Sequence, residues 1–214
     1  MSDKRYFKII DNKQVAPRYF LMKIEAPEIA QKGKPGQFVH IKVIDDMVYD
    51  PLLRRPFSFF DINKDKNFIK LVYEIVGKGT KILSGLSAGK KINVLGPLGN
   101  GFDLNHKNQP VIIGGGMGIA PLFYLVKSFL KKGKIPEVFL GGNKKEDILF
   151  FIKKFKKLNI NLSIATMDNS IGYEGNVVDL WHKNLNISRE NNFIFSCGIS
   201  YPIYLFDPRF IPIN

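Results

Sequence analysis

The fold is set by one run of residues, Pro110-Val111-Ile112-Ile113-Gly114-Gly115-Gly116-Met117-Gly118-Ile119-Ala120-Pro121, which joins an apolar segment to a helix through a glycine-rich turn. Residues 110–114 suit a buried parallel strand, and residues 121–130 favour a helix with proline in its first turn. Glycine at four of the five positions from 114 to 118 lets the backbone approach a ligand closely. Such a turn is the usual seat of a pyrophosphate, so the run predicts nucleotide binding, although a tight structural turn also uses glycines.

The residues that follow repeat this alternation of apolar runs and helical segments. The spacing Gly116-x-Gly118-x-x-Pro121 differs from the Rossmann GxGxxG pattern because proline holds its last position. We expect further strands at residues 138–140, 162–165 and 193–195, and further helices at residues 147–158 and 177–185. This order is typical of a doubly wound parallel sheet.

The first half of the chain shows a different pattern, with short strands between turns. We expect strands at residues 37–44 and 68–76, and breaks at residues 26–27, 63–65 and 88–90. Several strands at this spacing favour a small antiparallel barrel or sandwich.

The two patterns meet at Gly96-Pro97-Leu98-Gly99-Asn100-Gly101-Phe102, a segment rich in turn-forming residues. We therefore expect an antiparallel β-barrel domain at residues 1–100 and an α/β doubly wound parallel-sheet domain at residues 101–198. Residues 199–214 form an atypical tail, in which three prolines exclude a long helix and the alternation stops one helix and one strand early.

Two turns in the first domain carry candidate phosphate contacts. In Leu53–Phe60, Arg55 offers a forked cation and Ser58 a hydroxyl beside a strand that proline fixes. In Gly77-Lys78-Gly79-Thr80, the glycines let N–H groups approach an anion, and Thr80 is expected as the N-cap of a short helix. Each turn is also compatible with a purely structural role.

Composition favours a globular protein, and its positive net charge would suit a polyanionic partner such as a nucleic acid. The chain has 214 residues, 45% of them hydrophobic, and a net charge of +13. Its lysines are scattered, with modest clusters at residues 131–132, 153–154 and 156–157, so we expect no nucleic-acid partner. The longest uncharged run, 108–126, is interrupted by glycines and prolines, and the N-terminus lacks the core of a signal peptide. We expect no membrane span and a cytoplasmic location.

Metal ligands are sparse. The single cysteine, Cys197, excludes an intramolecular disulfide and an all-cysteine iron–sulfur site within this chain, and it favours a reducing compartment. His40, His106 and His182 lie far apart without ligand spacing. We therefore expect no metal site.

Five motifs occur in order along the chain: Leu53–Ser58, Gly77–Thr80, Gly96–Phe102, Gly114–Leu122 and Ser196–Gly198. Together they resemble the ferredoxin-NADP reductase superfamily and, more narrowly, the electron transfer subunits of class B dihydroorotate dehydrogenase. The likeness extends from about Lys8 to Gly198.

The resemblance implies an FAD-binding barrel and an NAD-binding sheet domain. For FAD it implies Arg55, Gly79 and Thr80 at the pyrophosphate, Ser58 beside flavin N5, and a flavin lining made by Pro56, Phe57, Val72, Tyr73 and Glu74. For NAD it implies Gly115, Gly116, Gly118, Ala120 and Pro121 at the pyrophosphate, with Cys197 and Gly198 facing the nicotinamide. Ser58 and Cys197 are the implied catalytic residues, although Cys197 is equally compatible with an apolar role at a strand end.

The implied reaction is hydride transfer between nicotinamide C4 and flavin N5. In the family, an FMN-containing catalytic subunit oxidises dihydroorotate in pyrimidine biosynthesis, and a two-iron, two-sulfur cluster relays the electrons to FAD. The implied partner is that catalytic subunit, in a hetero-oligomer of the heterotetramer type. NAD is favoured over NADP because Gly142-Asn143-Lys144-Lys145 has no arginine, although Lys144 or Lys145 is a candidate contact for a 2′-phosphate.

The likeness ends at Gly198. The relatives continue into a Pro-x-x-Met motif and a segment with four cysteines, whereas Ile199 stands where proline is expected and one cysteine does not support the cluster. This departure indicates a truncated or out-of-frame reading of a longer subunit. Two other functions stay open: a stand-alone NAD(P)H:flavin-type oxidoreductase, and a degenerate subunit that docks on a partner without transferring electrons.

Overall fold

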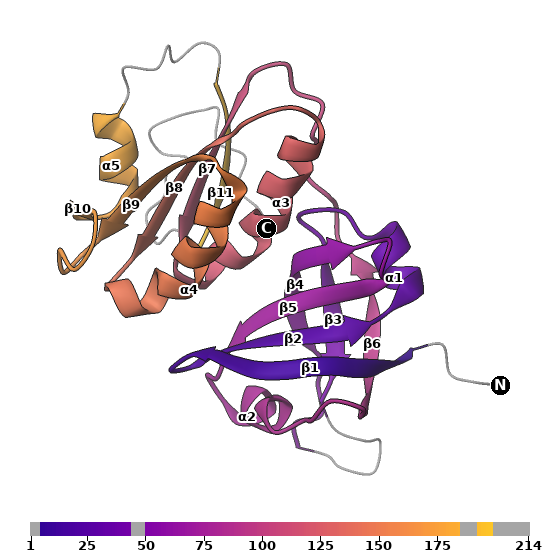
Figure 1. Ribbon diagram of the computed structural model, residues 1–214. Helices are drawn as coiled ribbons and strands as arrows, with labels where there is room; N and C mark the ends of the chain where they lie inside the picture. Colours follow the sequence, from indigo (N-terminus) through magenta and orange to yellow (C-terminus); the bar gives the residue numbers. More distant parts are fainter. Residues whose placement is uncertain (1–4, 44–49, 185–191, 199–214) are drawn as a thin grey trace. The chain divides into compact units, whose positions relative to one another are not determined.

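The computed structural model describes residues 5–43, 50–184 and 192–198 (Figure 1). The chain divides into two compact units, Met1–Phe102 and Asp103–Asn214. The atypical tail expected at residues 199–214 lies outside the described residues, as do Ile44 and Leu185 at the expected ends of a strand and a helix.

The first unit is a closed antiparallel barrel with the strand order β1-β2-β5-β4-β3-β6, which confirms the expected barrel over a sandwich. Its strands are β1 (Tyr6–Ala16), β2 (Tyr19–Glu25), β3 (Phe38–Lys42), β4 (Arg55–Asn63), β5 (Phe68–Glu74) and β6 (Lys91–Leu98). In β4, Phe57 and Phe59 are buried, whereas Pro56 is exposed and Ser58 is half-buried. Alternate side chains therefore fill the barrel and face away from its interior.

Two short helices accompany the barrel, α1 (Pro27–Lys32) and α2 (Lys78–Ser84). Helix α1 was not expected, because Ala26-Pro27 is typical of a break in the chain. In the structure Pro27 starts the helix, where its missing N–H removes no intrahelical hydrogen bond, and Ile29 and Ala30 are buried. Helix α2 lies beside β1 (Figure 1).

The second unit is a sheet with the strand order β10-β9-β8-β7-β11, and every neighbouring pair is parallel. This arrangement confirms the expected α/β fold. Its strands are β7 (Gln109–Gly115), β8 (Glu137–Gly142), β9 (Asn161–Thr166), β10 (Tyr173–Glu174) and β11 (Asn192–Cys197). Strand β10 was not expected, since two residues are too short to show a period.

Helices cover both faces of this sheet (Figure 1). They are α3 (Ile119–Lys131), α4 (Lys145–Phe155) and α5 (Val177–Lys183), with the 3₁₀ turns η1 (Gly116–Gly118) and η2 (Lys156–Leu158). Helices α3 and α4 contact each other on one face. On the other face, Val177 and Trp181 of α5 join Val111, Phe139 and Ile194 of the strands in one buried cluster. Burial on both faces explains why the strands read as continuous apolar runs.

None of the helices within residues 5–43, 50–184 and 192–198 combines the length and the apolar character needed to cross a membrane.

The order of the strands reverses at β7. The chain moves from β7 to β8 and β9, and β11 then returns to the opposite side of β7. Cys197 at the end of β11 pairs in register with Gly114 of β7. In open α/β sheets, ligands bind beyond the carboxyl ends of the strands at such a reversal, so the ends of β7 and β11 mark the expected ligand edge.

Candidate functional sites in the two units

The glycine-rich turn of the sheet unit connects β7 to α3 through the single 3₁₀ turn η1. Gly116 has a φ of +52°, in the left-handed region that favours glycine, and a Cβ placed on it would meet no atom within 4 Å. The backbone at Gly116 is therefore open to an approaching group. Helix α3 follows directly, and its first N–H groups have no acceptor within the helix.

The end of β11 packs directly on this turn. A Cβ on Gly118 would lie 2.4 Å from the Cα of Gly198, and a Cβ on Gly198 would lie 2.3 Å from the carbonyl oxygen of Gly115. Contacts this short leave no room for side chains, so the two segments touch backbone to backbone. The structure thus brings Gly115, Gly118, Cys197 and Gly198 together at the reversal of strand order.

The other predicted residues of this site differ in their burial. Ala120 and Pro121 are buried in the first turn of α3. Cys197 is partly buried, and burial raises the pKa of its thiol above the ordinary 9.0, so the group stays neutral at physiological pH. The thiol therefore presents a neutral and weakly polar surface at the end of β11.

In the barrel unit, two neighbouring arginines point to different partners. Arg54 donates from Nη2 to Oδ1 of Asn93 at 2.7 Å, a contact that joins the segment just before β4 to β6. Arg55 donates from Nη1 to the carbonyl oxygen of Leu53. Its Nε would lie only 3.3 Å from a Cβ placed on Gly79, so the Arg55 side chain lies against the start of α2.

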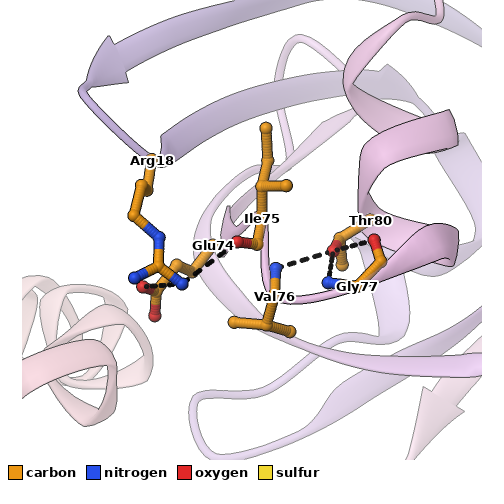
Figure 2. Close-up of polar contacts among 6 residues, drawn as sticks. All are labelled: Arg18, Glu74, Ile75, Val76, Gly77 and Thr80. Carbon is orange, nitrogen blue, oxygen red and sulfur yellow. Dashed lines mark hydrogen bonds and ion pairs between the residues drawn. The ribbon is translucent and has the colours of Figure 1, made fainter.

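The turn before α2 differs from its expected form (Figure 2). Gly77, not Thr80, is the N-cap, and Thr80 is the third residue of the helix, so the expected N-cap was wrong. The hydroxyl of Thr80 accepts hydrogen bonds from the N–H groups of Val76 at 3.0 Å and Gly77 at 3.2 Å. It also donates to the carbonyl oxygen of Gly77 at 3.1 Å. A threonine at this position fixes the turn by reaching back, as the third residue of a capping box does.

Strand β5, which precedes this turn, ends at an ion pair that Figure 2 also shows. Arg18 lies 3.2 Å from Oε1 of Glu74 and donates to the carbonyl oxygen of Ile75 at 3.3 Å. Val72 and Tyr73 are buried, with exposed fractions of 4% and 2%. Glu74 is therefore engaged by Arg18, and the two residues before it belong to the core.

Two residues of the expected flavin lining are in aromatic contact. The rings of Phe57 and Tyr73 stand edge to face with centroids 5.6 Å apart. Ser58 is half-buried on β4 opposite Phe38 of β3, and Pro56 is exposed. Within the barrel the structure thus places Arg55 beside Gly79 and Phe57 beside Tyr73, whereas Thr80 is bonded within its own turn and Glu74 is paired with Arg18.

One polar residue near these motifs, Asn12, belongs to none of them. Asn12, in the middle of β1, accepts a hydrogen bond from the hydroxyl of Tyr73 at 3.0 Å and donates to the carbonyl oxygens of Leu83 in α2 and Leu86 just after it. Its partners lie 61 to 74 residues away in the sequence, so no local pattern indicates them.

The described residues hold no group of three or more His, Cys, Asp or Glu side chains placed to bind a metal ion.

Comparison with known proteins gives a consistent result at the level of sequence. No family model matches the chain. Proteins named dihydroorotate dehydrogenase B (NAD(+)), electron transfer subunit, are similar to it, among them one from Fusobacterium nucleatum that is 36% identical over 195 residues, covering 88% of this chain and 73% of that protein. The relative from Bacillus pumilus is 37% identical over 202 residues, covering 91% of this chain and 74% of the relative.

Solved structures give the same fold. An NADH-dependent reduced ferredoxin-NADP oxidoreductase, studied for flavin-based electron bifurcation, matches with a TM-score of 0.79 and 28% identity over 92% of this chain and 69% of its own. A ferredoxin NADP+ reductase from Neisseria gonorrhoeae with bound FAD and NADP matches with a TM-score of 0.70 and 17% identity, covering 89% of this chain and 83% of its own. At that identity the second match concerns the fold alone.

Proposed function

The chain belongs to the family of dihydroorotate dehydrogenase B electron transfer subunits, and we propose that it passes electrons between a catalytic partner subunit and NAD through a bound FAD. The proposed FAD seat is in the barrel unit, and the proposed NAD seat is in the sheet unit.

The observation that carries this proposal is the contact between Gly118 and Gly198. It holds the end of β11 on the glycine-rich turn at the point where the strand order reverses. An open backbone at Gly116 and the start of a helix of 13 residues lie beside it. This combination suits a pyrophosphate, because N–H groups and the positive end of a helix dipole then face the same place.

The barrel residues suit FAD in a different way. Arg55 lies against Gly79, where the absence of a side chain lets the guanidinium approach the first turn of α2. A guanidinium and helix N–H groups together suit the charge of a diphosphate. We propose that Thr80 acts on this site through the turn, since its hydroxyl is taken up by Val76 and Gly77.

When bound, FAD and NAD supply hydride transfer between nicotinamide C4 and flavin N5. We propose that the half-buried hydroxyl of Ser58 donates a hydrogen bond to the flavin ring, and that Pro56, Phe57 and the strand Val72-Tyr73-Glu74 orient the ring. The neutral thiol of Cys197 and the backbone of Gly198 border the nicotinamide and exclude water from it.

The start of α4 supports NAD over NADP. The N–H of Lys144 donates to Oδ2 of Asp147 at 3.2 Å, and the N–H of Lys145 donates to Oγ of Ser170 at 2.7 Å. The hydroxyl of Ser170 in turn contacts Oδ1 of Asp168 at 2.6 Å. The backbone N–H groups that begin α4 are therefore bonded within the protein, and the carboxylates of Asp147 and Asp168 lie beside them. This negative charge disfavours the extra phosphate of NADP.

We propose an FMN-containing dihydroorotate dehydrogenase catalytic subunit as the partner, in a cytoplasmic hetero-oligomer of the heterotetramer type that serves pyrimidine biosynthesis. An iron–sulfur cluster held by four thiolates does not fit this chain, which has one cysteine. No electron-transfer step within this chain is therefore assigned to a cluster.

Reconstitution of the purified full chain with excess FAD tests the proposal. We expect a yellow protein that retains FAD through gel filtration and that co-purifies with the FMN-containing partner when the two are expressed together. Protein that stays colourless contradicts FAD binding. Protein that binds FAD but never associates with the partner contradicts the proposed partner and favours a stand-alone oxidoreductase.

A further inference from the structure

Asn12 connects three elements of the barrel unit. Its Nδ2 donates to the carbonyl oxygen of Leu83 at 2.9 Å and to that of Leu86 at 2.8 Å, and its Oδ1 accepts from the hydroxyl of Tyr73 at 3.0 Å. Carbonyl oxygens only accept, so the orientation of the amide is fixed by its partners. The side chain thereby ties β1 to β5 and to the last turn of α2.

The hydrogen bonds from Asn12 reach the C-terminal end of α2. The carbonyl oxygen of Leu83 in the last turn also accepts from the N–H of Leu86 at 3.1 Å, and Leu86 lies just after the helix. Asn12 supplies two donors from a strand that lies beside α2, so the position of the helix on the barrel wall is fixed at its C-terminal end.

Tyr73 is fixed on three sides. Its ring stacks on Phe20 with centroids 5.8 Å apart and meets Phe57 edge to face at 5.6 Å, while Asn12 holds its hydroxyl. Burial raises the pKa of the Tyr73 phenol, so the hydroxyl stays protonated and remains a donor.

Together these contacts join α2 to β4 at both ends of the helix. Phe57 lies two residues after Arg55 on β4, and Arg55 lies against Gly79 at the start of α2. Helix α2 is therefore joined to β4 at its first turn through Arg55, and at its last turn through Asn12, Tyr73 and Phe57.

We propose that Asn12 is a positioning residue of the flavin site. It sets the orientation of α2, and hence of Gly79 beside Arg55, relative to the rings of Phe57 and Tyr73. This inference rests on the proposed FAD seat in the barrel unit. It assigns to Asn12 no contact with the cofactor and no part in the electron transfer itself.

The substitution Asn12→Ala in the full chain tests this role. We expect FAD to bind about tenfold more weakly, because the hydrogen bonds to Leu83, Leu86 and Tyr73 are lost. We also expect an altered visible circular dichroism spectrum of the bound flavin, since the ring no longer lies in one fixed setting. Tyr73→Phe removes one of the three hydrogen bonds and keeps the ring contacts, so its effect is smaller, about threefold.

Gln14→Ala is the matched control. Gln14 lies on the same strand and its Nε2 donates to the carbonyl oxygen of Pro17 at 2.6 Å, but this contact is local and exposed. We expect wild-type FAD affinity and an unchanged flavin spectrum for this variant.

A wild-type dissociation constant and flavin spectrum in folded Asn12→Ala protein overturn the proposal, even where its melting temperature falls. If that variant does not fold, the same wild-type values in Tyr73→Phe overturn it. Failure of the wild-type chain to bind FAD counts against the proposed function itself, so the two failures are distinguishable.

Discussion

Two glycine-containing turns lead into helices in this protein, and they are built on different principles. Before α2, residues 75–80 are held by the Thr80 hydroxyl, and the space beside Gly79 is taken by Arg55. Before α3, Gly118 lies tightly against the backbone of Cys197 and Gly198, and the space beside Gly116 is open. The first turn depends on side chains, whereas the second depends on their absence.

This difference predicts how each turn responds to substitution. A turn held by side chains loses hydrogen bonds and charge one group at a time, with graded effects. A turn in which two backbones touch has no adjustable group, so one added carbon displaces a whole segment. We therefore expect the largest effects in the sheet unit and smaller effects in the barrel unit.

The largest expected effect is that of Gly118→Ala. The added Cβ would lie 2.4 Å from both the Cα and the N of Gly198 and 2.5 Å from the carbonyl carbon of Cys197. We expect the sheet unit to lose about 3 kcal/mol of unfolding free energy, the upper range for overpacking, and nucleotide binding to be abolished. Urea unfolding and calorimetric titration with NADH measure the two effects.

Gly116→Ala is the matched control in the same turn. Its Cβ meets no atom within 4 Å, so only the φ of +52° is unfavourable. We expect a loss of about 1 kcal/mol in stability from this backbone strain. Equal losses in the two variants contradict the claim that contact with Gly198 dominates the turn.

A smaller effect is expected for Arg55→Ala in the barrel unit. Loss of a charge-assisted hydrogen bond to a diphosphate removes about 1.5–3 kcal/mol, so FAD should bind roughly 10- to 100-fold more weakly. Arg55→Lys should restore only part of the affinity, because an ammonium lacks the planar fork of a guanidinium. Fluorescence titration with FAD measures both, and unchanged affinity in Arg55→Ala excludes the guanidinium from the site.

Thr80→Val should cost less. It removes the acceptor for two N–H groups while keeping the shape of the side chain, and we expect the barrel unit to lose about 1–2 kcal/mol of unfolding free energy. FAD affinity should fall only through the loosened turn. Thr80→Ser keeps the hydroxyl and should stay close to wild type. A Thr80→Ser variant as unstable as Thr80→Val contradicts the role of the hydroxyl.

The smallest effect concerns the one reactive side chain beside the glycine contact. Burial raises the pKa of Cys197 above 9.0, so its alkylation should be slow at neutral pH and rise through a midpoint above that value. The neutral thiol is favoured in the folded state, so its contribution to stability is complete below pH 9.0 and declines as pH rises through the raised pKa. Cys197 is the only cysteine, so the labelled product is unambiguous. A midpoint equal to that of the urea-unfolded chain contradicts this burial.

The strand–turn–helix at residues 110–130 could be predicted because its chemistry is local. Apolar residues, glycines and a proline near the helix start are read directly from neighbouring positions. The barrel was predictable as a class, since strands and turns recur at short spacing. Residue pairs such as Arg55 with Gly79 follow from the family motifs and not from any local period.

The features that the sequence does not predict have physical reasons. Helix α1 cannot be predicted from Pro27 alone, because a proline is typical both of a break in the chain and of the first turn of a helix. Threonine is typical of an N-cap, so the sequence predicts Thr80 there, whereas Gly77 holds the cap and Thr80 acts from the third position of the helix. Asn12 could not be found at all, since its hydrogen bonds cross 61 to 74 residues.

Anaerobic titration of the FAD-reconstituted full chain with NADH tests the central claim most directly. If the barrel and sheet seats serve one hydride transfer, the flavin absorbance near 450 nm should bleach with about one equivalent of NADH, and far more slowly with NADPH. Bound FAD that stays oxidised under excess NADH contradicts the claim and leaves a protein that docks on its partner without transferring electrons.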